Sequence, residues 1–173
     1  MENVRFQKIE PAELAVKPVG LFGKDWMLLT AGGMEKHNCM TIAWGSLGTL
    51  WGLPAATVYV RPERYTHSFL TGSEVFTICA FDESRREQLV LCGTKSGRDT
   101  DKEALCGLTP VESGSGAVYY AEARLAVVCK KLYTQDFELS RIADERVRKI
   151  YAHGEQLHSV FVGEILEVLE KED

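Results

Sequence analysis

A series of β-strand patterns at short intervals is the feature that most constrains how this chain folds. Residues 25–33, 38–46 and 55–61 each combine apolar, aromatic or β-branched residues with a glycine or polar end, and residues 74–81 repeat the pattern. Residues 34–37 supply a hairpin connection between the first two strands. Strands joined by such short links pair in antiparallel fashion.

The second half of the chain adds more strand patterns than helical ones. Residues 118–135 suit one long bent strand or two strands, and residues 158–170 read as a final alternating strand. The helical patterns cover residues 10–16, 62–72, 82–97 and 139–154, the last with apolar residues at Ile142, Ala143, Val147, Ile150 and Tyr151. Because strands outnumber helices without alternating regularly, we predict an α+β, mainly β fold: an antiparallel sheet that closes into a barrel with peripheral helices.

Length and charge narrow the class of protein. The 173 residues suit a single domain, residues 1–173, with a sizeable core. The net charge of −5 argues against a nucleic-acid-binding protein, because binding nucleic-acid phosphates needs an excess of basic residues. No apolar run approaches the ~20 residues of a membrane helix, and the N-terminus has no signal-peptide pattern. We expect a cytoplasmic protein that binds neither nucleic acid nor a membrane.

The cysteines and histidines do not indicate a disulfide framework or a metal site. The cysteines are odd in number and scattered, with no C-x-x-C pair, and we expect most of them to be small buried apolar groups. His153 and His158 are five residues apart, which fits neither one helical face nor one strand face well. The cysteines are Cys39, Cys79, Cys92, Cys106 and Cys129.

The stretch "TIAWGSLGTLWG", residues 41–52, has an unusual composition for either a strand or a loop. It holds two tryptophans and three glycines and carries no charge. A strand buried on both faces would favour Val and Ile, and an exposed loop seldom carries two tryptophans. This composition indicates a ribbon that lies against another surface or a ligand.

A second stretch, "CGTKSGRDTDKEAL", covers residues 92–105 and has the chemistry of a phosphate site. Its glycines let backbone N–H groups approach a ligand, its hydroxyl groups add donors, and Lys95, Arg98 and Lys102 add positive charge. The alternative is a solvated connection between two helices. The chain contains neither the glycine motif of a Rossmann site nor that of a P-loop.

A third stretch, "YVRPERYTHSF", covers residues 59–69 and turns a corner from a strand to the next element. Arg61 closes the strand, Pro62 breaks the chain, and Tyr65 and Thr66 follow. These side chains either surround an anionic, planar ligand or belong to an ordinary strand-to-helix corner with a surface arginine.

Together, "NCMTIAWGSLGTLWG", "ATVYVRPERYTHSFL" and "LCGTKSGRDTDK" resemble the flavin reductase-like family of FMN-binding split-barrel proteins, the group that includes flavoredoxin. The resemblance is strong over about residues 25–105 and weaker at the closing "HSVFVGEILEV". The chain has "WG" where two-component flavin reductases tend to show "NS", which favours a retained FMN over a freely exchanged one.

The resemblance implies a homodimer that holds FMN near the subunit interface. It places the ribbon from Asn38 to Ser46 along the isoalloxazine ring and ribityl chain, with Trp44 covering or flanking the ring. It assigns Trp51 to barrel packing or the dimer contact, and it leaves His158 either near the ring or substrate or as a surface or interface histidine. The implied cofactor-binding residues are Asn38, Met40, Thr41, Ile42, Ala43, Trp44, Ser46, Arg61, Tyr65, Thr66, Cys92, Ser96, Gly97 and Lys102.

Three functions follow from these patterns. The first is an FMN-dependent oxidoreductase, either a NAD(P)H:flavin reductase or a flavoredoxin-like electron carrier that serves a redox partner protein. In such a protein N5 of the cofactor accepts the hydride or electrons, and the protein orients and tunes it. The second is an FMN-binding or storage protein without dedicated turnover. The third is a barrel that binds no flavin and whose basic loop is incidental.

Overall fold

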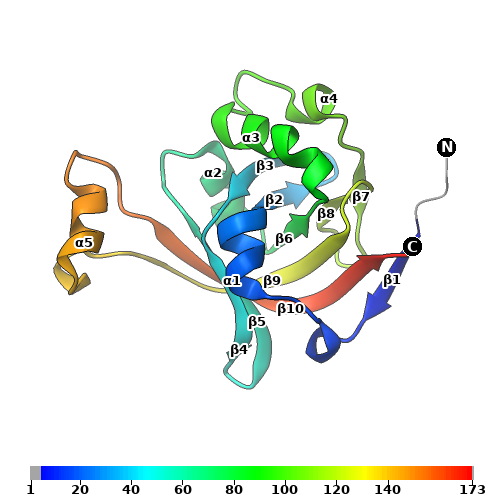
Figure 1. Cartoon of the computed structure of the whole chain (residues 1–173), viewed down its shortest axis with the longest axis horizontal. Helices are drawn as coiled ribbons and strands as arrows, with labels where there is room; N and C mark the ends of the chain where they lie inside the picture. Colours follow the sequence, from blue (N-terminus) through cyan, green and yellow to red (C-terminus); the bar gives the residue numbers. More distant parts are fainter. Residues whose placement is uncertain (1–4, 173) are drawn as a thin grey trace.

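One strongly curved antiparallel sheet organises the chain in the computed structural model, which describes residues 5–172 (Figure 1). The eight-stranded sheet has the order β3-β2-β6-β9-β10-β5-β4, with β1 paired to β10, and β7 and β8 form a separate pair. The strands are β1 (Phe6–Ile9), β2 (Met27–Gly33), β3 (Lys36–Ile42), β4 (Gly45–Leu50), β5 (Leu53–Val60), β6 (Val75–Ala80), β7 (Pro110–Glu112), β8 (Val118–Tyr120), β9 (Leu125–Asp136) and β10 (Ser159–Lys171).

The strand order forces the sheet to curl into a split barrel. β3 and β4 are the two ends of the order, yet they follow each other in the chain with only Ala43 and Trp44 between them. A sheet whose edge strands are joined by so short a link cannot stay flat, so the edges must approach each other. This arrangement confirms the predicted fold class.

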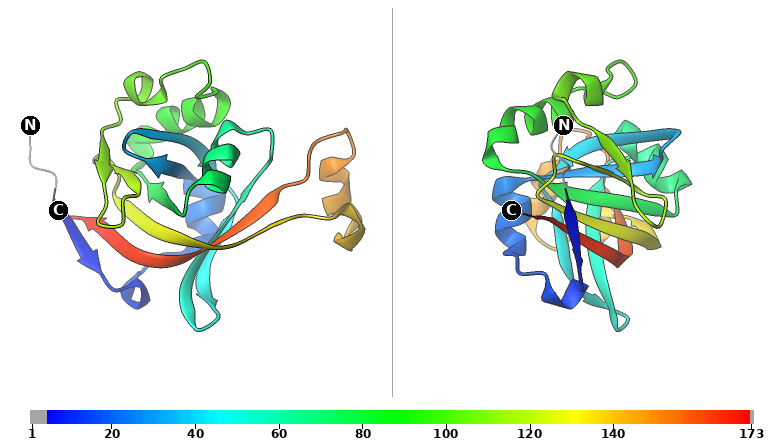
Figure 2. Two further views of the ribbon diagram at one scale, coloured as in Figure 1. Left: turned by 180° about the vertical axis from the view of Figure 1, so that it is seen from behind. Right: turned by 90° about the vertical axis from the view of Figure 1, so that its right-hand side faces the viewer.

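β10 joins the two halves of the barrel. It pairs with β9 along nearly its whole length on one side, and with β5 and then β1 on the other. The pairing with β9 shifts register between Val162 and Gly163 and again between Ile165 and Glu167. Such bulges bend a strand and increase its twist, and β9 and β10 are visibly curved in both views of Figure 2.

Both faces of the central strands are buried, against two different cores. Leu29 of β2 belongs to the inner core of the barrel with Val58 and Val127. Its neighbour Leu28 faces the outer core, which includes Leu89 of the helix over β3. Side chains alternate between the faces of a strand, so a continuous apolar run such as "MLL" fills both cores. Each fully buried leucine contributes about 1.5–3 kcal/mol.

The helices are short and lie around the sheet. α3 and α4 cover the outer face near β2 and β3, and α2 connects β5 to β6 (Figure 1). Among residues 5–172, no helix has the length and apolar character needed to cross a membrane. The α-helices are α1 (Pro18–Gly20), α2 (Tyr65–Gly72), α3 (Arg86–Thr94), α4 (Lys102–Cys106) and α5 (Glu145–Arg148), and further short turns of helix are Pro11–Glu13, Leu21–Asp25, Glu83–Arg85, Leu139–Arg141 and Lys149–Tyr151.

The ribbon predicted as one strand over residues 38–46 is divided in two. β3 ends at Ile42, the chain bends at Ala43 and Trp44, and β4 begins at Gly45. A side chain at Gly45 would collide with the Phe22 ring, so only glycine fits at this position. The hairpin from β4 to β5, which we did not predict, turns at Trp51 and Gly52, both with the positive φ that such tight hairpin turns require.

The single helix predicted over residues 139–154 is wrong. Residues 137–157, here called the arm, form a projecting excursion between β9 and β10 that contains only short helical turns (Figure 2). The apolar side chains Leu139, Val147 and Ile150 are exposed by 40–49%. Helices in proteins depend on packing of an apolar face, and within the described chain this stripe has no core to pack against.

The close fit at Gly163 yields a test of the packing inside the barrel. A Cβ added at Gly163 would lie 2.7 Å from the Phe76 ring and 2.9 Å from Cβ of Cys129. We therefore expect Gly163→Ala to lower the free energy of unfolding by about 1–3 kcal/mol, the range for overpacking a core. Urea unfolding measures this change. Gly48→Ala in β4 is the control, because its Cβ would meet nothing within 4 Å; equal effects of the two substitutions would contradict the packing argument.

Candidate functional site

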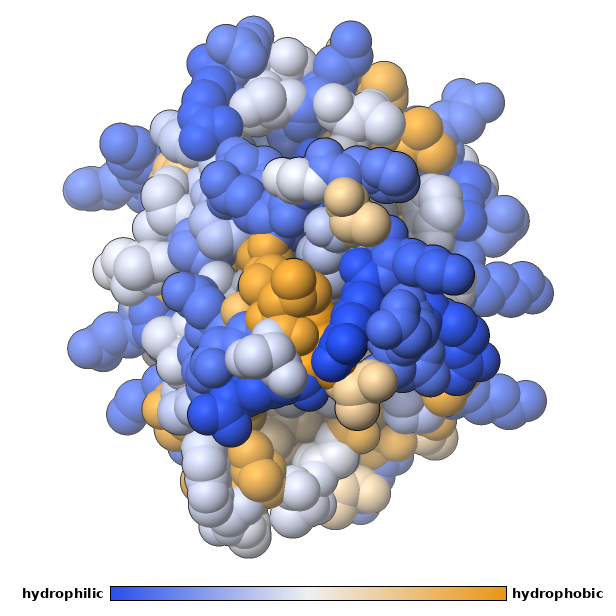
Figure 3. Space-filling model, turned by 90° about the vertical axis from the view of Figure 1, so that its left-hand side faces the viewer, coloured by the Kyte–Doolittle hydropathy of each residue, from blue (hydrophilic) through white to orange (hydrophobic). Residues whose placement is uncertain are grey.

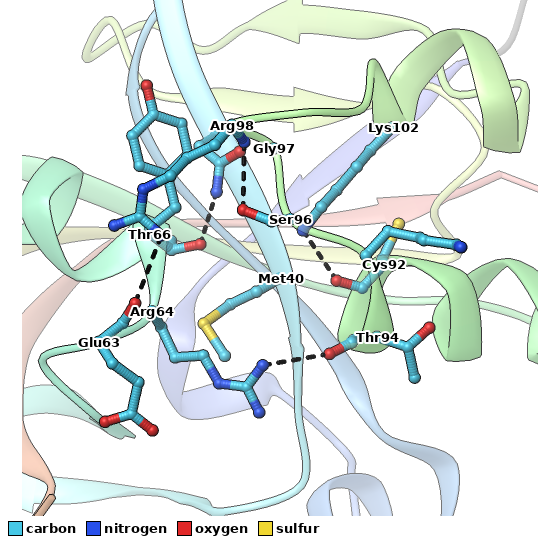
Figure 4. A pocket seen from close by; sticks show the side chains of 14 residues that line it. Met40, Glu63, Arg64, Thr66, Cys92, Thr94, Ser96, Gly97, Arg98 and Lys102 are labelled. Atoms are coloured by element: carbon cyan, nitrogen blue, oxygen red, sulfur yellow. Dashed lines mark hydrogen bonds between the residues drawn. The ribbon is translucent and has the colours of Figure 1, made fainter.

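A cavity of about 230 Å³ lies between β3, the start of α2 and the loop that joins α3 to α4 (Figure 4). We call it the basic cavity because four of its lining residues are cationic and one is acidic. Its cations are Arg64, Lys95, Arg98 and Lys102, and its remaining lining residues are Asn38, Met40, Glu63, Tyr65, Thr66, Cys92, Gly93, Thr94, Ser96 and Gly97.

Lys102 links the structural elements that surround this cavity. Its Nζ donates hydrogen bonds to the backbone carbonyl oxygens of Cys39 (2.7 Å) and Cys92 (2.9 Å), so α4 is tied to both β3 and α3. The residue is buried, and that burial lowers the pKa of its ammonium group. Lysine has three N–H donors, and these two bonds leave one for a ligand. Lys102 is therefore both a structural tie and a source of charge.

Arg64 and Arg98 supply more accessible charge from opposite sides of the cavity. The Arg98 guanidinium lies over the Tyr65 ring, 4.8 Å from its centroid, and donates a long hydrogen bond of 3.5 Å to the Glu63 carbonyl. Arg64 donates to the carbonyl of Gly93 across the cavity at 3.4 Å. Both residues are exposed, and guanidinium groups suit the oxygens of phosphate or carboxylate.

Polar side chains position the backbone of the loop. Asn38 donates from Nδ2 to Oγ1 of Thr66 (2.7 Å) and to the carbonyl of Cys39 (3.2 Å), which joins β3 to α2. Gly97 passes so close to Asn38 that an added Cβ would collide with Oδ1. Ser96 accepts a hydrogen bond from the backbone N–H of Arg98. Gly97 therefore lets the loop backbone reach β3 in a way that no other residue allows.

A second hollow, also of about 230 Å³, lies at the seam between β3 and β5; we call it the aromatic hollow. The Trp44 ring stacks at a tilt on His158, with centroids 4.7 Å apart, and Trp44 stays 45% exposed. Its lining residues are Met40, Thr41, Ile42, Ala43, Trp44, Tyr59, Val60, Arg61, Arg64 and His158. Met40 and Arg64 line both cavities, so the two are adjacent along β3.

His158 is held as a neutral imidazole. Burial lowers its pKa to about 4, and the positive charge of Arg61 acts in the same direction; Glu63 opposes this shift, and Arg64 adds a smaller lowering. Nδ1 forms a hydrogen bond of 2.9 Å with the Tyr151 hydroxyl of the arm. The arm is thus connected to the aromatic hollow through Tyr151, His158 and Trp44.

The structure brings together nearly all of the residues that we expected at one site. The basic cavity contains Asn38, Met40, Tyr65, Thr66, Cys92, Ser96, Gly97 and Lys102. The aromatic hollow contains Met40, Thr41, Ile42, Ala43, Trp44, Arg61 and His158. Ser46 lines neither cavity and lies exposed in β4 beside Thr57. Arg61 faces the aromatic hollow and not the basic cavity.

Several site residues were not among those expected. Arg64, Tyr59 and Glu63 line the two cavities, and Tyr151 reaches His158 from the arm. Arg64 stands in the corner "RPERY", directly before Tyr65, so a charge count of that stretch is the signal that would have revealed it. No local sequence pattern identifies Tyr151 as a site residue, because it lies on the arm and reaches His158 only in the folded chain.

The neutral state of His158 predicts a pH dependence of stability. The unfolded chain binds a proton near the ordinary histidine pKa of about 6.5, whereas folded His158 binds it only near 4. Acidification through this interval therefore favours unfolding. We expect His158→Gln to reduce the loss of stability between pH 7 and pH 4.5, measured as the urea midpoint. Tyr151→Phe keeps the imidazole and should retain the wild-type loss; equal losses in all three proteins would contradict this assignment.

Comparisons with known proteins agree with this geometry. No curated protein sequence matches the chain. Among solved structures, flavoredoxin from Methanosarcina acetivorans is 22% identical, with 86% of this chain and 69% of that chain covered and a TM-score of 0.68. An FMN-binding domain of a flavin reductases-like enzyme from Shewanella baltica is 18% identical, with 98% and 79% covered and a TM-score of 0.69. The NADH:FAD oxidoreductase SgcE6 of Streptomyces globisporus, in complex with NAD and FAD fragments, is 18% identical, with 86% and 77% covered and a TM-score of 0.61.

These similarities establish the split-barrel fold, and a family assignment comes from the sequence itself. Residues 19–173 match the family described as flavin reductase like domain. The match spans most of the chain and includes both cavities. The chain belongs to the flavin reductase-like family.

Proposed function

We propose that this protein is an FMN-dependent oxidoreductase, in which hydride or electrons pass through a flavin held along β3. The observation that carries the proposal is that a cationic cavity lies directly beside an aromatic hollow, with Met40 and Arg64 lining both. FMN has the same two parts, a phosphate end and a planar ring. The family match over residues 19–173 supports treating the chain as one flavin-binding domain.

The residues of the basic cavity fit a phosphate group. Arg64, Arg98 and Lys95 offer charged donors, and Ser96 adds a hydroxyl group beside the close-packed backbone at Gly97. Charge-assisted hydrogen bonds to such groups are about twice as strong as neutral ones. We favour FMN over FAD because the cations gather in one compact cavity, although the relative from Streptomyces globisporus is named for FAD.

The residues of the aromatic hollow fit a flat ring system. Trp44 and Tyr59 offer aromatic surfaces, and the backbone from Met40 to Ala43 offers N–H and C=O groups along one edge. When bound, FMN supplies the redox chemistry, because its ring accepts hydride or electrons. The chain's own part is to orient the ring against Trp44 and Tyr59 and to hold positive charge nearby through Arg61 and Arg64.

The electron source within this proposal is NADH or NADPH, or else a redox partner protein. The exposed edge of Trp44 leaves the aromatic hollow open to solvent, so a second reactant has access to it. Steady-state oxidation of NADH and NADPH with added FMN distinguishes a nicotinamide-dependent reductase from an electron carrier.

We expect FMN binding to depend on the cations of the basic cavity. Arg98→Gln and Arg64→Gln should each weaken FMN binding roughly ten- to a hundredfold, since each removes a charged contact to phosphate worth about 1.5–3 kcal/mol. Binding of riboflavin, which lacks the phosphate, should change far less. The measurement is fluorescence titration of flavin-free protein with both ligands.

Two features make this titration decisive. Arg146→Gln is the matched control, because Arg146 lies exposed in α5 with its ion pair to Asp144 on the arm. Lys102 is less suitable for substitution, since its loss also removes the two bonds that hold α4 to β3 and α3. Wild-type protein that is colourless and binds neither flavin would disprove the proposed function.

We further propose a homodimer, supported by the exposed apolar tip of the β4–β5 hairpin. Trp51 is 63% exposed and lies in edge-to-face contact with Tyr133, which is itself 43% exposed, and Leu50 is beside it. Exposed hydrophobic groups of this kind favour a partner surface. Figure 3 shows further hydrophobic side chains gathered among hydrophilic ones on the face that bears the arm.

Light scattering at micromolar concentration is expected to give twice the chain mass of 19.3 kDa. Trp51→Asp should shift the protein toward the monomer, because it places a charge in the apolar contact. Val90→Asp is the control, since Val90 is 44% exposed on α3, which lies at the opposite end of the molecule from the β4–β5 hairpin (Figure 1). A monomeric wild type would refute the dimer.

A further inference from the structure

Three thiols meet beside the basic cavity, where the proposed function gives them no role. Cys39 lies on β3, Cys92 on α3 and Cys106 at the end of α4, and all three are buried. The Sγ atoms of Cys92 and Cys106 are 3.7 Å apart. Cys92 lines the basic cavity, and Cys39 lies on β3 between Asn38 and Met40, which line it too, so a small reactant in this cavity is near thiols that are themselves only 1% and 3% exposed.

Cys92 and Cys106 bracket the loop that forms one wall of the basic cavity. Every loop residue that lines this wall, from Gly93 to Lys102, lies between them in the chain. A disulfide has an S–S distance of about 2.05 Å, so the sulfurs would need to approach by roughly 1.7 Å. Lys102 donates to the Cys92 carbonyl and so holds α4 and α3, which carry these thiols, next to each other.

Cys39 is the thiol of these three whose surroundings favour the thiolate. The Cys92 thiol donates to Cys39, and this hydrogen bond, aided by Tyr120 and the Lys102 ammonium, lowers the pKa of Cys39 to about 7. The same hydrogen bond raises the pKa of Cys92, because its proton is shared with Cys39. Cys79 and Cys129 lack such a partnership, and burial raises the pKa of each.

We infer that Cys92 and Cys106 form a reversible disulfide when a hydroperoxide enters the basic cavity, and that this bond fixes the loop between them. The Cys39 thiolate attacks the distal peroxide oxygen and the O–O bond breaks. With hydrogen peroxide this gives a sulfenic acid on Cys39 and hydroxide. The Cys92 sulfur then attacks the Cys39 sulfur, and the Cys92 proton leaves with the sulfenic oxygen as water. The Cys106 sulfur displaces Cys39 from the Cys92 sulfur, and the Cys106 proton passes to Cys39, which leaves as a thiol. Two thiols are oxidised and one peroxide is reduced.

The disulfide has a consequence for cofactor retention, which rests on the proposed function. A loop fixed in the conformation that forms the basic cavity loses less freedom when a phosphate binds. We therefore expect the oxidised protein to bind FMN roughly three- to tenfold more tightly than the reduced protein. Bound FMN occupies the entry route and should slow the oxidation.

The test compares flavin-free protein treated with hydrogen peroxide or with dithiothreitol. Alkylation of the denatured chain should label three thiols after peroxide in place of five, and trypsin should leave the Cys92 and Cys106 peptides linked although Lys95, Arg98 and Lys102 between them are cleaved. Dithiothreitol should restore all five. Five labelled thiols after peroxide, or a disulfide between any other pair, would overturn the inference.

Variants and a second readout separate this inference from the proposed function. Cys106→Ala should abolish the disulfide and the change in FMN affinity, Cys39→Ala should slow oxidation, and Cys129→Ala, a buried control in the inner core, should behave as wild type. Hydrogen exchange of residues 93–105 should slow on oxidation even if the chain binds no flavin. Unchanged hydrogen exchange and unchanged FMN affinity in the oxidised protein would disprove that the disulfide fixes the loop.

Discussion

The short link between β3 and β4 is the constraint on which the rest of the structure depends. Ala43 and Trp44 connect strands at opposite ends of the sheet order, so the sheet must curl until those edges meet. The edges are held near each other by a chain connection and not by a complete ladder of hydrogen bonds, which leaves a seam. The aromatic hollow lies at this seam, between the end of β3 and the end of β5. Barrel closure and the position of the site therefore have one cause.

Electrostatics then distinguishes the two ends of the site. The chain as a whole carries a net charge of −5, yet four cations line the basic cavity. Lys102 is the buried one, and its two bonds to backbone carbonyls offset part of the cost of burying an ammonium group. Arg64 and Arg98 remain exposed and are free to follow an anion. A local excess of positive charge on an acidic protein attracts anionic ligands to that one place.

The sequence predicted the parts of the fold whose pattern is local. Continuous apolar runs marked β2 and β6, and the alternating end of the chain marked β10, because each of these strands packs against a core within this chain. At Gly45, where β4 begins, the backbone passes against the Phe22 ring, a contact that no strand pattern reveals. The helix predicted for the arm was wrong for a different reason. Its apolar residues do have helical spacing, but nothing in the described chain packs against them. The expected residues of the quoted stretches, apart from Ser46, line the two cavities, whereas Tyr151 depends on a contact across the arm.

The arm and the seam are coupled through His158. Tyr151 binds the imidazole from the arm side, Trp44 stacks on it from the seam side, and the ring stays neutral under Arg61 and Arg64. A protonated histidine would add a third positive charge to the hollow and would compete with the arginines for any anionic group. A neutral one leaves the guanidinium groups of Arg61 and Arg64 as the positive charges that line the hollow, and these groups would stabilise negative charge on a flavin held there under the proposed function. Displacing the arm would remove the Tyr151 contact and with it one restraint on the orientation of His158 and Trp44.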